Sequence, residues 1–198
     1  MIKRAALLSL LPILPVPLAA QPTGLNGDVI DVEVLTGWRE PGMEHIAALR
    51  LTLAAGWKTY WRAPGDAGIP PMFDWDGSEN VATVRPHWPV PEIFNQNGMR
   101  SIGYDQQVVI PLHVTREDAN EPIRLQAEVS LGVCEEICIP AFVSIDALLP
   151  AQGAADEQII AALGDRPMTE AEAGVGDVVC SVMPIDDGLS LTVTVDMP

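Results

Sequence analysis

The sequence predicts an all-β protein built as an antiparallel β-sandwich, and two observations predict it. Apolar residues come in short runs and alternate with polar residues, as they do in half-buried strands. The chain also contains 16 Gly and 18 Pro residues, many of which gather between those runs, as is typical of turns. Many short strands joined by such turns indicate a sandwich rather than a parallel sheet flanked by helices.

Five segments have the alternation of strands. They are residues 28–38, 45–57, 107–115, 123–133 and 142–150. Three segments between them have the composition of turns, at 63–71, 74–80 and 95–99. We therefore expect the sandwich to occupy residues 21–150.

Residues 151–177 are expected to form a short helix followed by a linker. Asp156 is a suitable N-cap residue and Gly164 a suitable last residue, so the helix is expected within 156–166. The acidic, small-residue segment 167–177 then has the composition of a linker.

The last segment, residues 178–198, has the pattern of a β-hairpin with its turn at Asp186–Gly188. Cys180 lies on its first strand and is expected to be a buried thiol that packs like a small apolar residue. A lone hairpin is marginally stable. This one is therefore expected to dock on the sandwich, to pair with another chain or to begin a second β domain.

Residues 1–20 have the pattern of a secretory signal peptide. Lys3 and Arg4 precede an apolar run that closes on the small residues Ala19 and Ala20. A membrane anchor is the alternative, but the run is shorter than the roughly 20 residues that a span needs, and its three Pro residues break helix hydrogen bonding. No later segment is long and apolar enough to span a membrane. We therefore expect an exported protein with no membrane span in the mature chain.

The charge of the chain excludes one class of partner. The formal net charge is −16, and loss of the leader with Lys3 and Arg4 leaves 9 basic against 27 acidic residues, a charge of −18. Nucleic acids repel so acidic a protein, and nucleic-acid binding is therefore excluded.

The cysteines are the next feature. In an oxidising compartment, disulfides form and persist, and the odd number of cysteines, three, leaves at least one without a partner in the chain.

Two of the cysteines, Cys134 and Cys138, are separated by three residues in the segment LGVCEEICIPA, residues 131–141. If they flank a tight turn between two strands, their Cα atoms lie about 4.5–5.5 Å apart. That separation falls inside the range of roughly 4.4–6.8 Å that a disulfide tolerates. The pair can therefore form and open a disulfide without large backbone movement.

Three interpretations of the pair remain open on spacing alone. A structural disulfide here closes a loop of about five residues and stabilises by only about 2 kcal/mol. A metal site needs further ligands, and none of the candidates has metal-type spacing to the pair, although two thiolates alone could hold Cu(I). Reversible dithiol–disulfide exchange needs two close thiols at an accessible turn. The candidate extra ligands are His45, His87, His113 and Cys180, with Met43, Met72 and Met99 as soft ligands or, alternatively, gap-filling residues.

Two acidic residues, Glu135 and Glu136, lie between the cysteines. Carboxylates beside a thiol disfavour its thiolate form and raise the pKa of the thiol. That effect opposes the acidic thiols of strong oxidants and favours a reductant or electron carrier whose thiol is activated when a partner docks. Alternatively, both carboxylates point to water and change the pKa of the thiols little.

Three segments resemble a known family when taken in order. They are GWKTYWRAPGDAGIPPMFDWDGSEN (56–80), WPVPEIFNQNGMRSIGYDQQVVIPLHV (88–114) and GVCEEICIPA (132–141). Together they resemble the N-terminal periplasmic domain of the thiol:disulfide interchange protein DsbD, and more closely its ScsB-type relatives, which are linked to suppression of copper sensitivity. The resemblance covers roughly residues 28–150.

The resemblance implies an immunoglobulin-like sandwich in the periplasm whose cysteine pair shuttles electrons without a cofactor. It implies that Cys138 forms the mixed disulfide with a partner and that Cys134 resolves it. The implied partners are a thioredoxin-like electron donor and periplasmic proteins that contain disulfides. The alternative function is a non-redox or copper-binding interaction module.

Besides the two glutamates, three residues are candidates for supporting roles at the cysteine pair. Tyr60 and Trp61 could shield a disulfide from stray thiols, and they could equally be core packing. Asp66 could assist proton transfer to a leaving thiolate. Its PGDAG context also suits a turn residue that bonds its own backbone, which is the interpretation we favour.

Overall fold

The computed structural model describes residues 29–96 and 98–198, so the expected signal peptide lies outside the described residues. The elements, in chain order, are β1 Ile30–Arg39, β2 Glu44–Leu53, β3 Lys58–Gly65, β4 Met72–Asp74, β5 Thr83–Pro86, β6 Glu92–Gln96, β7 Met99–Asp105, β8 Gln107–Thr115, β9 Ile123–Cys134, β10 Cys138–Leu149, α1 Glu157–Gly164, β11 Val178–Ile185 and β12 Gly188–Val195.

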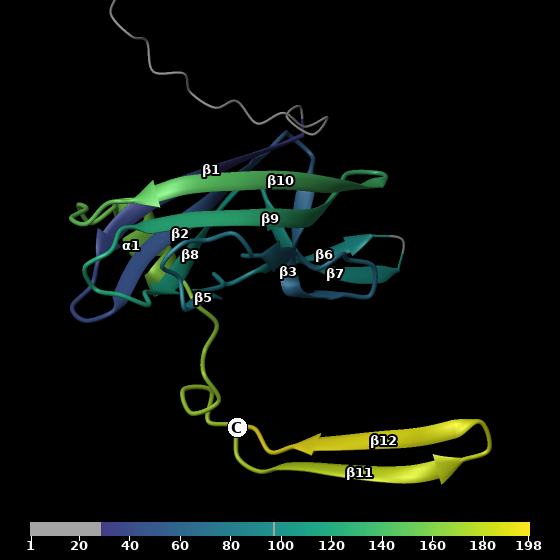
Figure 1. Cartoon of the computed structure of the whole chain (residues 1–198). Coiled ribbons are helices and arrows are strands. Elements are labelled where there is room, and N and C mark those ends of the chain that lie inside the picture. The colour runs from purple at the N-terminus through teal and green to yellow at the C-terminus, as the bar shows by residue number, and fades with distance from the viewer. Residues whose placement is uncertain (1–28, 97) are drawn as a thin grey trace, which may run out of the picture.

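Two antiparallel sheets form the body of the molecule (Figure 1). One has the strand order β1-β2-β8-β5, and the other has the order β10-β9-β3-β7-β6 with β4 paired to β9. Residues of β2 and β8 in the first sheet share one hydrophobic core with residues of β9 and β10 in the second. The predicted antiparallel sandwich is therefore confirmed.

Alternation along the strands supplies this core. In β9, the odd-numbered residues from Ile123 to Val133 are buried and face the first sheet. Leu49 and Leu51 of β2 meet them from that sheet. Full burial of such a side chain stabilises the fold by about 1.5–3 kcal/mol. The even-numbered residues of β9 and β10 lie on the outer face of the second sheet, which carries the cysteines.

The expected strands match five observed ones with small shifts at their ends. The strand expected at 45–57 ends at Leu53, because the Trp57 N–H donates to the Ala54 carbonyl across a tight turn. The strand expected at 142–150 begins earlier, at Cys138, because β10 pairs with β9 along its full length.

Strands β3 to β7 were not expected from the sequence. The segments expected as turns at 63–71 and 95–99 overlap the end of β3 and the ends of β6 and β7. These strands are short, and β3 takes its partners from β7 and β9, which lie far along the chain. Pairing with distant strands can override a weak local preference.

The expected helix is confirmed as α1. The Asp156 carboxylate accepts hydrogen bonds from the backbone N–H groups of Gln158 and Ile159, at 2.8 and 3.2 Å, and so caps the first turn. Ile159 is fully buried against a second small core cluster with Leu35 and Ile46. No helix among the described residues is long and apolar enough to cross a membrane.

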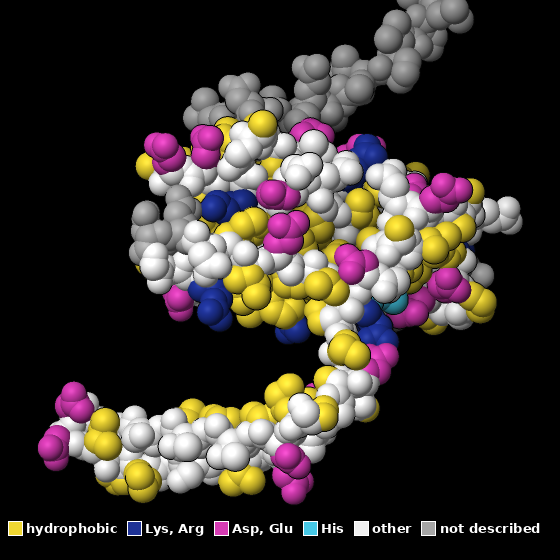
Figure 2. Space-filling view, turned by 180° about the vertical axis from the view of Figure 1, so that it is seen from behind, with side chains coloured by type: hydrophobic (Ala, Val, Ile, Leu, Met, Phe, Trp, Pro, Cys, Tyr) yellow, Lys and Arg dark blue, Asp and Glu magenta, His cyan; other side chains and the backbone are white. Residues whose placement is uncertain are grey.

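The C-terminal segment forms the expected hairpin, β11 paired with β12. It lies apart from the sandwich (Figure 1), and hydrophobic side chains line it in the space-filling view (Figure 2). All side chains of the two strands are exposed except that of Ser190, which is half-buried. The expectation that Cys180 is buried is wrong: Cys180 is exposed and its thiol is free, because no other part of the chain that the structure describes covers either face of the hairpin.

Candidate functional site

The candidate site lies where β9 ends and β10 begins. Cys134 and Cys138 are direct cross-strand partners, with Cα atoms 4.1 Å apart, and their sulfurs form a disulfide. This Cα separation is shorter than the about 4.5–5.5 Å expected from the sequence, although the expected cross-strand pairing of the two cysteines is as observed. The turn between them is closed by a hydrogen bond from the Glu135 N–H to the Ile137 carbonyl, 3.2 Å long.

The two cysteines differ in exposure. Cys134 is only 3% exposed, whereas Cys138 is exposed. Both lie on the outer face of the sheet. Of the two residues, Cys138 is therefore the one that solvent reaches.

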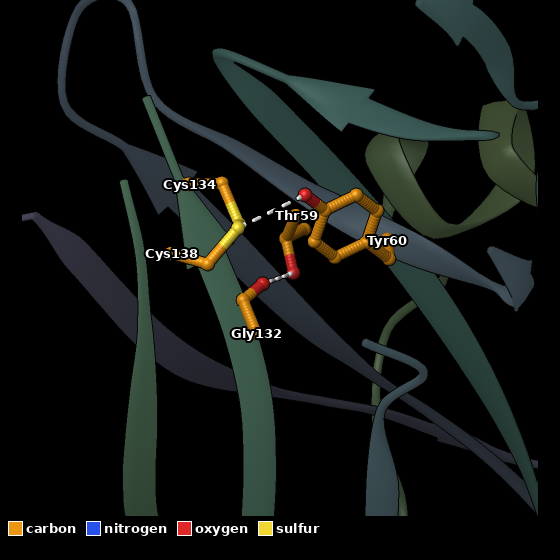
Figure 3. Close-up of a disulfide and its surroundings, with 5 residues drawn as sticks. All are labelled: Thr59, Tyr60, Gly132, Cys134 and Cys138. Carbon is orange, nitrogen blue, oxygen red and sulfur yellow. Dashed lines mark hydrogen bonds between the residues drawn. A yellow bond between two sulfur atoms is a disulfide. The ribbon is translucent and has the colours of Figure 1, made fainter. Parts of the chain in front are cut away.

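Strand β3 places a tyrosine against this disulfide. Lys58 and Thr59 pair with Cys134 and Val133, and the Thr59 hydroxyl donates to the Gly132 carbonyl at 3.0 Å. The Tyr60 side chain is 4% exposed, and its hydroxyl oxygen lies 3.6 Å from the Cys138 sulfur (Figure 3). Burial raises the pKa of Tyr60, so its phenol stays protonated and able to donate a hydrogen bond.

The segment Asp66–Ile69 covers this part of the outer face. A Cβ atom added at Gly68 would lie 2.7 Å from the Tyr60 ring and 2.4 Å from the Pro64 ring, so the segment lies directly on Tyr60. Ile69 lies on Gly132, where an added Cβ would lie 2.5 Å from the Ile69 Cβ. Glycine at these two positions permits the close contact.

Asp66 holds the start of this segment. Its N–H donates to the Arg100 carbonyl at 2.7 Å, and its carboxylate accepts from the Arg100 N–H at 3.0 Å. These bonds tie Asp66 to β7. The expectation that its carboxylate bonds its own local backbone is therefore wrong, because the pairing of β3 with β7 brings the distant Arg100 N–H to it.

A cavity of about 120 Å³ opens beside the disulfide. The two glutamates expected near the cysteines line it, together with Tyr60. Its lining residues are Tyr60, Ala67, Met99, Ser101, Cys134, Glu135, Glu136 and Cys138. Thus the structure brings five of the seven sequence-derived site residues to one cavity.

Trp61 lies elsewhere. It packs against the hydrophobic core, with the Arg62 guanidinium 4.5 Å from the centre of its ring. It lines a different cavity, of about 500 Å³, together with His87, Trp88 and Arg166. Core packing therefore accounts for Trp61 better than shielding of the disulfide does.

Ala67 and Ser101 were not expected at the site from the sequence, and Met99 was expected there only as a candidate soft ligand. Met99 and Ser101 belong to β7, whose neighbour β3 ends about 35 residues earlier in the chain at Gly65. Long-range pairing of β7 with β3 places Met99 and Ser101 at the cavity beside the cysteines.

The other candidate metal ligands do not gather at the cysteines. Among the described residues, no three His, Cys, Asp or Glu side chains lie close enough to hold a metal ion. His45 is buried and bonds the Thr36 carbonyl at 2.7 Å, and the His87 and His113 rings lie 6.1 Å apart. Met99 is the thioether at the cysteine cavity.

Comparisons with known proteins agree with this architecture. The family model described as "Thiol:disulfide interchange protein DsbD, N-terminal" matches residues 29–150. The fold is similar to the N-terminal periplasmic domain of ScsB from Proteus mirabilis, with a TM-score of 0.63 and 24% identity over 88% of this chain and 83% of that one. The N-terminal domain of DsbD from Neisseria meningitidis, in its reduced form, matches with a TM-score of 0.37 and 14% identity over 64% of this chain and 90% of that one. Among curated protein sequences, none matched this chain.

Proposed function

This chain belongs to the family of N-terminal domains of the thiol:disulfide interchange protein DsbD, and from that premise we propose that it passes electrons between proteins of the periplasm. The sandwich is immunoglobulin-like, and its family is associated with thiol–disulfide exchange. Electrons pass through the Cys134–Cys138 pair, from a thioredoxin-like donor to periplasmic proteins that contain disulfides, in a protein-disulfide reductase pathway.

The observation that carries this proposal is the unequal exposure of the two cysteines: Cys134 is buried and Cys138 is exposed. A donor thiolate attacks the exposed Cys138 sulfur, the disulfide breaks, and the Cys134 sulfur leaves and takes up a proton. The second thiol of the donor then attacks the mixed disulfide. The donor ends as a disulfide, and this protein ends as a dithiol that carries two electrons and two protons.

Delivery to the partner runs through the same sulfur. The Cys138 thiolate attacks a disulfide of the partner and forms a mixed disulfide, and one partner sulfur leaves as a thiol. The Cys134 thiolate then attacks the Cys138 sulfur, which re-forms the internal disulfide and releases the partner with two thiols. The recessed position of Cys134 supports this resolving role, since a bound partner leaves it next to Cys138 and closed to other thiols.

Neighbouring groups support the cycle. The Tyr60 hydroxyl lies within reach of the Cys138 sulfur and donates to the thiolate that forms there. Glu135 and Glu136 line the same cavity, and their charges oppose a free thiolate until a partner is bound.

The test is the reduction potential of the pair in the purified mature protein, with Cys180→Ser in the background to remove the third thiol. Equilibration in glutathione or dithiothreitol buffers should give a potential of roughly −180 to −270 mV, between thioredoxin-like donors and periplasmic oxidants. A value below about −300 mV is that of a structural disulfide and would favour a non-redox interaction module. In addition, Cys134→Ser should accumulate a mixed disulfide with a partner, and Cys138→Ser should not.

A second candidate function is Cu(I) binding, and the position of Met99 favours it. In the reduced protein, two thiolates and the Met99 thioether would line one cavity, and soft sulfur ligands suit Cu(I). Titration of the reduced protein with Cu(I) against a chelator of known affinity should then show one site that weakens in Met99→Leu. If copper binds equally well to the Met99→Leu and Cys134→Ser variants, Cu(I) binding at this site is rejected.

A further inference from the structure

The disulfide is the first of three successive cross-strand pairs on the outer face of β9 and β10. The pairs are Cys134 with Cys138, Gly132 with Pro140 and Ser130 with Phe142. Side chains of paired residues point to the same face, and every second pair along the ladder returns to that face. Pro140 and Phe142 thus extend from the disulfide along the exposed side of β10.

Two residues from outside β9 and β10 extend this exposed apolar surface. Ile69 lies over Gly132, and Met72 of β4 pairs with Ser130, on the side opposite Phe142. We name Ile69, Met72, Pro140 and Phe142 the apolar track. Its side chains are open to solvent: Met72 is 66% and Phe142 64% exposed.

The track ends at a polar boundary. In the next pair on this face, the Ser144 hydroxyl donates to the Glu128 carboxylate at 2.8 Å. Beyond it, Asp146 accepts from Arg124 at 2.6 Å and from Gln126 at 3.1 Å. The track is therefore an apolar strip with the disulfide at one end and satisfied polar groups at the other, as in the core and rim of a protein interface.

We propose that the apolar track binds the polypeptide next to the reacting cysteine of the exchange partner, and that it selects partners with apolar residues there. The inference rests on the proposed function. A mixed disulfide holds the two Cα atoms about 5.5–6 Å apart, so residues that flank the partner's cysteine must lie against the surface around Cys138. From Cys138 to Phe142 is four residues of strand, roughly 13 Å, which an extended segment of about four residues covers.

Charge argues against a second copy of this chain as the occupant. The formal net charge is −16, and Glu135 and Glu136 lie directly beside the reactive sulfur. Two copies that meet at this site would bring like charges together, which costs free energy at an interface. The exchange partner is the molecule that the sulfur chemistry itself brings to this surface.

The experiment uses two disulfide-linked homodimeric peptides that differ only beside the cysteine: three Leu or Val residues on each side in one, three Ser residues in the other. Reduced protein converts each dimer to two peptide thiols as its own disulfide forms. We expect the apolar dimer to react about tenfold faster, after correction for the rates of the same dimers with dithiothreitol. Phe142→Ser and Met72→Ser should each cut that preference at least about threefold, as loss of a buried interface anchor does.

Leu148→Ser is the matched control. Leu148 is 66% exposed and lies on the same face of the same strand as Phe142, but beyond the polar boundary. Its variant should keep the full preference. The inference is overturned if Phe142→Ser and Met72→Ser behave like Leu148→Ser while the protein still reduces both peptides. If the protein reduces neither peptide nor glutathione disulfide, the proposed function fails and the inference fails with it.

Discussion

At the scale of single residues, the disulfide is defined by what touches it. Cys134 is buried under its neighbours, Cys138 faces solvent, and Tyr60 brings a protonated hydroxyl to the exposed sulfur. Two other residues could have belonged to the site on sequence grounds, but Asp66 instead bonds the backbone of Arg100 in β7, and Trp61 packs against the core. The surroundings of the cysteine pair therefore consist of the residues that bury Cys134 and the Tyr60 hydroxyl at Cys138.

Tyr60→Phe tests the hydroxyl. The ring and its packing remain, but the reduced Cys138 thiolate loses a hydrogen-bond donor. We expect the pH dependence of the alkylation rate of the reduced protein to shift to higher pH, because hydrogen bonds to charged groups are stronger than those between neutral groups. Disulfide exchange should slow about three- to tenfold for the same reason. An alkylation profile identical to that of the parent protein would show that the 3.6 Å contact does not act on the thiolate.

His45 makes stability depend on pH. Burial, followed by the charges of Arg39 and Arg116, lowers the pKa of His45, against the effect of its bond to the Thr36 carbonyl. Below about pH 6.5, the unfolded chain binds a proton that the folded chain does not. Stability is therefore full above this pH and falls as the pH drops toward the lowered pKa, by at most about 1.4 kcal/mol per pH unit.

Urea unfolding at pH 7.5 and 5.5 measures this effect. The variant His45→Gln keeps a donor for the Thr36 carbonyl but cannot titrate. The loss of stability between the two pH values should be smaller in the variant than in the parent protein. His87 also has a lowered pKa, caused mainly by burial, so part of the pH dependence remains in the variant. Equal losses in both proteins would contradict the prediction.

At the scale of elements, the site is an assembly of four strands and one covering segment. Strands β9 and β10 hold the cysteines, β3 supplies Tyr60, and β7 supplies Met99 and the anchor for Asp66. The covering segment Asp66–Ile69 packs through Gly68 on Tyr60 and through Ile69 on Gly132. Its contacts decide how much of the outer face an approaching thiol can reach.

Gly68→Ala tests this segment. The added methyl group meets the Tyr60 ring at 2.7 Å and Pro64 at 2.4 Å, so the segment must shift. Overpacking of this kind costs about 1–3 kcal/mol, and we expect faster reduction of the disulfide by dithiothreitol because its cover is displaced. Gly164→Ala, where an added Cβ meets nothing within 4 Å, is the control and should change neither property. Unchanged stability and reactivity in Gly68→Ala would show that the segment adapts without moving.

At the scale of the whole molecule, the sandwich and the C-terminal hairpin differ in how they are stabilised. The sandwich encloses a continuous core between two sheets. The hairpin buries almost nothing, although Val179, Leu189 and Leu191 among others are exposed on it. Exposed apolar surface of this extent is typical of a segment that binds something else.

Truncation after residue 177 tests the independence of the sandwich. Because the hairpin covers no part of the core, its removal should change the thermal midpoint of the sandwich by less than about 2 °C, and it should leave the reduction potential of the cysteine pair unchanged. The truncated protein should also be more soluble, since exposed strand edges promote association. A drop of several degrees in the thermal midpoint of the sandwich would instead mean that the hairpin docks on it.

The sequence by itself determined the fold class, a helix within residues 156–166, the hairpin, and the candidate cysteine pair. Each of these is encoded locally, by period-two alternation, a capping residue or a short spacing. Only the tertiary structure decided that Tyr60, Met99 and the apolar track lie around the disulfide, because the order of strands in a sheet brings together residues far apart in the chain. Exposure of Cys180, burial of Cys134 and the separate position of Trp61 follow from the same cause: what covers a side chain is set by neighbouring elements and not by its local sequence.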